Sequence, residues 1–204
     1  MIQVLIVDDH PLIREGVGSL IERESDMALV GEAANGREAV DQFRALRPDI
    51  TLMDLQMPQA NGVQAIATII QEFPDARIIV LTTYSGDAQA TRAFKAGAVG
   101  YLLKSSIRRE LLDVIRSVHA GSRYVEREVA NQVALHLLDA PLAERETAVL
   151  KLVARGLGNK QIADALGIAE ETVKAHLKNA FVKLKAKDRT HAVVEAARRG
   201  FMEL

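Results

Sequence analysis

Residues 1–10 read MIQVLIVDDH, an apolar run that ends in two adjacent aspartates. Four further apolar runs of strand length follow in the first half of the chain, at residues 27–33, 50–53, 77–81 and 100–103. The segments between the runs, such as residues 12–20, carry apolar side chains at helical spacing. Strands that are apolar throughout and alternate with helices predict an α/β fold, a doubly wound parallel sheet with helices on both faces.

The second half of the chain loses the strand pattern after Ala120. Residues 126–138 carry apolar side chains at an interval of four, which predicts a connecting helix that Pro141 brings to an end. From Glu144 onward the pattern predicts four helices, separated by glycines and a polar turn. We therefore expect three parts: a domain at residues 1–120, a connecting helix and linker at residues 121–141, and a small all-α domain at residues 142–204.

Composition excludes several kinds of site. The 204 residues include no cysteine, which rules out disulfides and thiolate chemistry. No apolar run approaches the roughly 20 residues of a membrane span, and the N-terminus turns acidic too early for a signal peptide, so we expect a cytoplasmic protein without membrane segments. The five histidines show no ligand spacing, so a metal site would have to rest on carboxylates; they are His10, His119, His136, His176 and His191.

Charge is unevenly distributed along the chain. Residues 1–120 hold 12 Lys or Arg and 16 Asp or Glu, whereas residues 142–204 hold 12 and 8. A basic C-terminal part is typical of a domain with a polyanionic partner, and a difference of this size also falls within ordinary surface variation. Motifs have to decide between the two interpretations.

Polar side chains stand at the ends of the predicted strands, where parallel sheets bind their ligands. They are Asp8 and Asp9 after the first run, Asp54 after the third, Thr82 after the fourth and Lys104 after the fifth. Two carboxylates about 4 Å apart repel by about 4 kcal/mol at an effective dielectric constant of roughly 20, and Lys104 with a hard cation such as Mg²⁺ would offset this. Asp54 can then attack a phosphoryl donor, with Thr82 donating a hydrogen bond to a phosphoryl oxygen.

At these strand ends the chain resembles the receiver domain of two-component response regulators. Residues 1–120 carry its four segments in order, as VDDH, LMDLQMPQANG, VLTTY and GYLLK. The resemblance implies a five-stranded sheet in the order 2-1-3-4-5, with Asp54 as the phosphoacceptor. It further implies that Asp9, Asp54 and the backbone carbonyl of Gln56 coordinate Mg²⁺, while Asp8 acts directly or through water.

The resemblance also implies a switch pair, Thr82 and Tyr101. On phosphorylation Thr82 would move toward the phosphoryl group and the aromatic ring would swing inward behind it. A strand aromatic that only fills the sheet edge is the alternative for Tyr101. One position departs from the family pattern: Ser105 follows Lys104, where many receivers have a proline after a cis bond, so the geometry of that loop does not follow from the resemblance.

Residues 170–185 have the pattern of an amphipathic helix. One face is apolar, and the other carries cationic and hydrogen-bonding side chains, which suits either a DNA groove or a solvated surface. Upstream, residues 160–166 predict a short helix and Gly167 a tight turn, which together give a helix-turn-helix. The predicted core positions of the longer helix are Val173, Leu177, Ala180, Phe181 and Leu184.

Over most of residues 142–204 the chain closely resembles the LuxR-type DNA-binding domain, for example along LAERETAVLKLVARGLGNKQIADALGIAEETVKAHLKNAF. The resemblance implies that Lys174, Ala175 and Lys178 face bases in the major groove. It implies that phosphates are contacted mostly by Lys160, Thr172, His176 and Asn179. Domains of this type commonly pair through their last helix, and Val193, Val194 and Ala197 either form that seam or pack inside the domain.

Together these motifs predict a transcriptional regulator. A sensor histidine kinase would phosphorylate Asp54, and the phosphorylated chain, a homodimer, would bind double-stranded promoter DNA. The chain would be no enzyme beyond its own phosphorylation and dephosphorylation. Two alternatives are a Mg²⁺-dependent phosphohydrolase with an aspartyl-phosphate intermediate, and a constitutive DNA binder whose receiver is a protein-interaction module.

Overall fold

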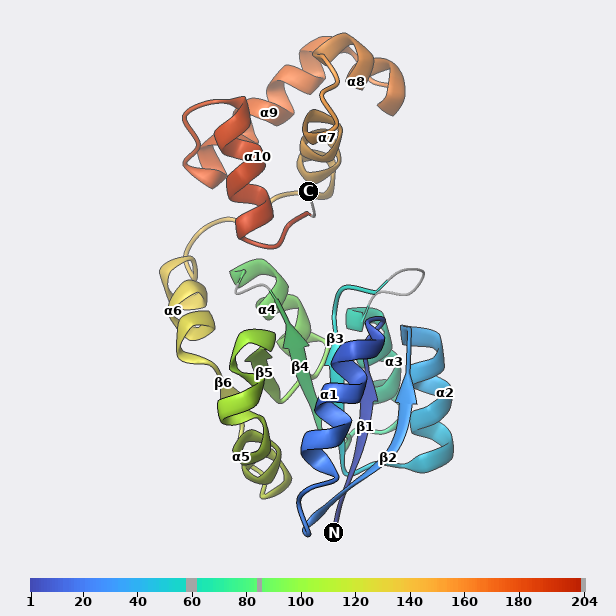
Figure 1. Ribbon diagram of the computed structural model, residues 1–204. Helices are drawn as coiled ribbons and strands as arrows, with labels where there is room; N and C mark the ends of the chain where they lie inside the picture. The colour runs from blue at the N-terminus through green and yellow to red at the C-terminus, as the bar shows by residue number, and fades with distance from the viewer. Residues whose placement is uncertain (58–61, 84–85, 203–204) are drawn as a thin grey trace. The chain divides into compact units, whose positions relative to one another are not determined.

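The computed structural model describes residues 1–57, 62–83 and 86–202 (Figure 1). The chain divides into two compact units, the first built from Met1–Thr83 and Ala90–Ala130 and the second containing residues 131–202. Each unit has a hydrophobic core of its own. Within the described ranges, no helix is both long enough and apolar enough to cross a membrane.

The first unit is built on a parallel sheet in the order β2-β1-β3-β4-β5-β6. Its strands are β1 (Ile2–Val7), β2 (Met27–Ala33), β3 (Ile50–Asp54), β4 (Ile78–Thr82), β5 (Gly100–Leu103) and β6 (Tyr124–Val125). The predicted α/β class and the predicted order of the first five strands are confirmed. The sixth strand was not predicted, because a strand of two residues is too short to show a pattern in the sequence.

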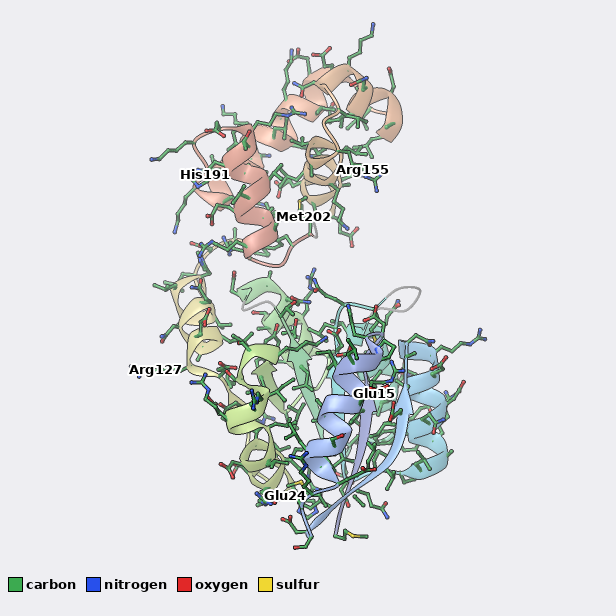
Figure 2. The ribbon with its side chains drawn as sticks, in the orientation of Figure 1. Glu15, Glu24, Arg127, Arg155, His191 and Met202 are labelled. Atoms are coloured by element: carbon green, nitrogen blue, oxygen red, sulfur yellow. The ribbon has the colours of Figure 1, made fainter. Side chains whose placement is uncertain are left out.

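Helices cover both faces of this sheet (Figure 1). On one face, apolar side chains of α1 and α5, such as Ile21 and Leu111, pack against the buried strand residues Val4, Ile6 and Leu52. The side chains between the helices and the sheet are drawn in Figure 2. The helices of this unit are α1 (Pro11–Ile21), α2 (Gly36–Leu46), α3 (Gly62–Glu72), α4 (Asp87–Lys95), the short 3₁₀ turn η1 (Lys104–Ser106) and α5 (Ile107–His119).

The connecting helix, α6 (Arg127–Leu135), is shorter than predicted. The prediction extended it to residue 138, but the chain turns instead at His136, whose Nδ1 lies 2.7 Å from Asp139 Oδ2. Of the apolar residues that suggested the longer helix, Val129 is buried, whereas Leu137 is 74% exposed. The interval of four continues in the sequence as far as Leu137, but the side chain of Leu137 stays exposed and does not join a hydrophobic core.

The second unit holds the four helices predicted from the sequence: α7 (Glu144–Ala154), α8 (Asn159–Leu166), α9 (Glu170–Leu184) and α10 (Arg189–Arg198). Gly167 ends α8 with a φ of 64°, a left-handed conformation that glycine adopts without strain, so α9 can follow after a short turn. The predicted core face of α9 is buried at Val173, Leu177, Ala180 and Leu184, with Phe181 packed at its edge. The helices α8 and α9 and the turn between them therefore form a helix-turn-helix.

Candidate functional site

The register of the parallel strands brings the polar strand ends together. Val7 is paired with Met53, so the next residues, Asp8 and Asp54, lie side by side at the same edge of the sheet. Thr82 is paired with Leu103, which places Lys104 just beyond the end of β4. The convergence predicted from strand ends alone therefore has a direct cause in the sheet register.

Lys104 bridges two buried carboxylates. Its Nζ lies 2.8 Å from Asp54 Oδ2 and 2.6 Å from Asp8 Oδ2. Asp8 and Asp54 are 1% and 2% exposed, so water screens these charges little. The backbone of Asp8 is fixed as well, because its carbonyl accepts a hydrogen bond from Arg14 Nη1 at 2.7 Å.

Burial and charge act in opposite directions on this pair. Burial raises the pKa of Asp54, and the hydrogen bonds from Lys104 and from the Gln56 N–H only partly offset it. Burial alone would lower the pKa of Lys104, but its hydrogen bonds to Asp54 and Asp8 outweigh burial and raise the pKa. Lys104 is therefore favoured as a cation, whereas burial leaves the charged form of Asp54 less favoured than that of a free aspartate, and the hydrogen bonds from Lys104 and Gln56 limit that rise in pKa.

A metal ion would find oxygen ligands here. Asp8, Asp9, His10 and Asp54 each offer an atom within 4.8 Å of the others. Within the described ranges, the buried Asp9 Oδ1 accepts no hydrogen bond, although His10 Nδ1 lies 2.8 Å away. Three carboxylates with an unsatisfied oxygen suit a hard divalent cation.

His10 is a member of this cluster that the sequence did not identify. The histidines were expected to show no ligand arrangement, yet His10 Nδ1 is within reach of both Asp8 and Asp9, at 3.2 and 2.8 Å. Its side chain is 64% exposed, so it lies at the mouth of the site. Its position directly after the Asp8–Asp9 pair, at the end of a strand, was the signal that could have found it.

The structure also places Gln56 and Gly62 at this site. The backbone N–H of Gln56 donates a hydrogen bond to Asp54 Oδ1 at 3.1 Å, and the predicted metal role of its carbonyl stays a prediction. A Cβ at Gly62 would come within 2.2 Å of the Asp54 carbonyl oxygen, so only glycine fits so close to the Asp54 backbone. Residues 58–61 of the receiver-like segment lie outside the described residues.

Thr82 and Tyr101 form a buried pair beside Asp54. Both residues are 0% exposed. Burial raises the pKa of Tyr101, and a hydrogen bond with the Thr82 side chain opposes that rise. The Tyr101 ring also lies 6.0 Å from the Phe94 ring, centroid to centroid. The Tyr101 side chain is thus buried and hydrogen-bonded to Thr82, and the role of the two residues as a switch pair stays a prediction.

The second unit presents the polar face of α9 to solvent. Lys174, Ala175 and Lys178 are exposed, and Lys174 Nζ is held 2.7 Å from Glu171 Oε1. Of the residues predicted to contact phosphates, Lys160, Thr172 and Asn179 are exposed and His176 is half-buried. All seven are therefore at least partly accessible, and their contacts with DNA stay predictions.

Next to this face lies an open hollow of about 630 Å³. Its apolar floor includes Leu177 and Phe181, and its cationic side chains are Lys174, Lys178, Lys185 and Arg189. The sequence analysis did not select Lys185, the last residue of the predicted helix, or Arg189, which follows that helix and comes close to it only through the turn into α10. A cationic hollow beside α9 is suited to a phosphate backbone.

Both units match known protein families. Residues 4–116 match the family described as "Response regulator receiver domain". Residues 140–196 match the family described as "Bacterial regulatory proteins, luxR family". The first match alone spans more than half of the chain.

Full-length relatives share the same organisation. The chain is 38% identical to the response regulator protein VraR of Staphylococcus aureus, over 96% of each protein. It is 36% identical to an uncharacterized transcriptional regulatory protein, YxjL, of Bacillus subtilis, over 99% of this chain and 98% of that protein. Both relatives match nearly the whole chain, at 36% and 38% identity, and the chain therefore belongs to the same family as they do.

Solved structures agree. A LuxR-family two-component response regulator from an Aurantimonas species is 40% identical, with a TM-score of 0.65 over 68% of this chain and 99% of that one. The fold of RcsB from Salmonella enterica, solved on a promoter with a phosphoryl mimic, is similar over 97% of this chain with a TM-score of 0.73 at 24% identity. The chain thus belongs to the response regulators that join a receiver domain to a LuxR-type helix-turn-helix, and it is a DNA-binding transcriptional regulator of the two-component type.

Proposed function

We propose that a sensor histidine kinase phosphorylates Asp54 and that the phosphorylated chain binds promoter DNA as a homodimer. The observation that carries this proposal is the contact of Lys104 Nζ with both Asp54 and Asp8 at the strand ends. One cation that bridges a buried nucleophile and a second carboxylate is suited to neutralise charge during phosphoryl transfer. A regulator that binds chromosomal DNA works in the bacterial cytoplasm, which is where we place it.

In the proposed reaction an oxygen of Asp54 forms a bond to phosphorus, and the bond from phosphorus to the donor breaks. The electron pair leaves with the donor, either the histidine nitrogen of the kinase or the acetate of acetyl phosphate. Lys104 neutralises charge on the phosphoryl group, and Thr82 donates a hydrogen bond to one of its oxygens. No separate substrate is turned over, so the chain acts on its own phosphorylation state and is otherwise no enzyme.

We further propose that Asp9, Asp54 and the backbone carbonyl of Gln56 hold Mg²⁺, with Asp8 acting directly or through water. The buried, unsatisfied oxygen of Asp9 supports this assignment. Bound Mg²⁺ would supply positive charge to the phosphoryl oxygens.

For the second unit we propose major-groove contacts from Lys174, Ala175 and Lys178. Phosphate contacts would come from Lys160, Thr172, His176 and Asn179. The exposed face of α9 supports both sets. RcsB has been solved as dimers bound to DNA, which supports the proposed dimer of this chain. The domain boundaries predicted at residues 120 and 142 stay part of the proposal.

The decisive experiment is to incubate the full chain with acetyl phosphate and Mg²⁺ and to follow intact mass. The parent chain should gain one phosphoryl group, and Asp54→Ala should gain none. Asp75→Ala removes an exposed carboxylate in the same domain and should be labelled like the parent. Labelling of Asp54→Ala to the same extent as the parent would show that another residue is the acceptor.

A further inference from the structure

Glu126 reaches from the end of β6 to the segment that carries Lys104. Its Oε2 accepts the backbone N–H of Leu103 at 2.7 Å, and its Oε1 accepts the hydroxyl of Ser106 at 2.7 Å. Its own N–H donates to the carbonyl of Tyr101 at 3.1 Å. Arg127, labelled in Figure 2 at the start of α6, is the next residue along the chain.

These contacts continue the sheet where β6 stops. Backbone pairing between β5 and β6 covers only Gly100 with Tyr124 and Tyr101 with Val125. Beyond it, the Leu103 N–H would have no strand beside it, and the Glu126 carboxylate takes that place. A buried N–H left without an acceptor is costly, so the carboxylate stabilises this end of β5.

Lys104 lies between the two groups that Glu126 holds. It opens η1 (Lys104–Ser106), a single 3₁₀ turn with little hydrogen bonding of its own. Ser105 follows Lys104, and unlike a proline at that position it does not restrict the backbone. Yet Lys104 Nζ must reach Asp54 and Asp8 together, at 2.8 and 2.6 Å. The carboxylate of Glu126, bonded before and after Lys104, supplies the restraint that the segment lacks.

We propose that Glu126 is a positioning residue for the phosphorylation site, acting through the backbone on either side of Lys104. The proposal rests on the proposed role of Asp54 as phosphoacceptor. Glu126, directly after β6, would then help to hold Lys104 in place without touching Asp54 or a phosphoryl group itself.

The test compares labelling rates of full-length variants with acetyl phosphate and Mg²⁺. Glu126→Ala removes both side-chain bonds and should slow labelling by on the order of tenfold, because small displacements of a charge-stabilising group cost this much or more. Glu126→Gln retains both bonds, since its oxygen can accept from Leu103 and its amide can donate to Ser106, and it should stay within about twofold of the parent. Glu128→Ala, an exposed carboxylate two residues later, is the matched control and should be labelled normally.

A double substitution separates positioning from general loosening of the fold. In a Lys104→Ala chain, adding Glu126→Ala should leave the residual rate unchanged within about twofold, because the group being positioned is gone. A further drop of the full size would overturn the route through Lys104. Normal labelling of Glu126→Ala itself would also overturn the proposal.

Two further measurements keep the outcomes distinct. If Glu126→Ala loses its cooperative melting transition, Ser106→Ala takes its place as the test variant. It removes only the hydrogen bond from Ser106 to Glu126 and should slow labelling by roughly threefold. A parental labelling rate in Ser106→Ala would overturn the proposal. Failure of the parent chain itself to be labelled would refute the phosphoacceptor role of Asp54, a result visible before any Glu126 variant is compared.

Discussion

At the scale of residues, the site is dominated by an excess of buried negative charge. Lys104 is the ammonium shared by Asp8 and Asp54, and Asp9 adds a third carboxylate to the same cluster. A buried charge is tolerated only when it is paired and hydrogen-bonded. The arrangement therefore favours the arrival of positive charge and, with it, a phosphoryl group.

Lys104 should set the acidic limit of phosphorylation. Its hydrogen bond and charge lower the pKa of Asp54 against the effect of burial. Lys104→Met removes both, so the pKa of Asp54 should rise and less of the reactive carboxylate should remain as the pH falls. We expect the acidic limb of the labelling rate against pH to move toward higher pH. Rates with acetyl phosphate at saturating Mg²⁺, from neutral to mildly acidic pH, measure this shift.

The matched control is Lys95→Met, which removes an exposed lysine from the end of α4. Its pH profile should superimpose on that of the parent chain. A Lys104→Met profile with lower rates but an unmoved acidic limb would mean that Lys104 does not control the ionisation of Asp54.

The residues differ in how far the sequence revealed them. Asp8, Asp54, Thr82 and Lys104 could be placed together because each follows an apolar run, and parallel strands end at one edge of the sheet. Glu126 could not, since its contacts depend on a two-residue strand and on the direction of one side chain. Pattern reasoning locates residues by backbone period and does not resolve such contacts.

At the scale of elements, α9 carries lysines with two different tasks. Lys178 is exposed beside the cationic hollow, whereas Lys183 Nζ contacts the buried Glu146 of α7 at 2.8 Å. Glu146 also accepts the N–H of Ala143 at the start of α7. One face of α9 therefore points to solvent, while Lys183 near its C-terminal end ties the helix to α7.

Two substitutions on this helix should change different properties, one the affinity for DNA and the other the stability of the domain. Lys178→Ala should weaken DNA binding by about 1–3 kcal/mol if it contacts a base, with an unchanged melting temperature. Lys183→Ala leaves the Glu146 carboxylate buried without its cation and should lower the free energy of unfolding by about 1–3 kcal/mol. Thermal melting and fluorescence anisotropy with a labelled duplex measure the two effects.

Labelling of Asp54 provides the control for both variants, because the first unit has its own core and neither lysine belongs to it. It should proceed at the parental rate in each. A parental melting temperature for Lys183→Ala would show that the ion pair contributes little, and parental DNA affinity for Lys178→Ala would remove it from the interface.

Element boundaries show where helical periodicity stops being informative. The four helices of the second unit followed from their apolar spacing and from glycines such as Gly167. The connecting helix was extended too far because Leu137 kept the interval of four, although it lies exposed beyond the end of α6. A helix ends where its burial ends, and burial depends on neighbours that the local sequence does not contain.

At the scale of the whole molecule, two units with separate cores have to exchange a signal. Separate cores allow each unit to fold without the other, so phosphorylation can affect DNA binding only by shifting an equilibrium that both units share. Such coupling typically amounts to about 1–3 kcal/mol, or roughly 5- to 150-fold in affinity. Dimer formation is one way to supply it, because the second half-site is then bound intramolecularly.

The coupling should be reciprocal, which gives it a strict test. Beryllofluoride, a noncovalent phosphoryl mimic, should raise the affinity of the full chain for a duplex selected from a random pool, and the same duplex should raise the affinity for beryllofluoride by an equal factor. Titrations in both directions, with sizing alongside, measure the two factors and the dimer. Asp54→Ala should show neither effect, because it removes the carboxylate that we propose as the acceptor, which lies buried beside Lys104. Equal DNA affinity with and without beryllofluoride would instead identify a constitutive DNA binder, whose receiver domain serves another partner.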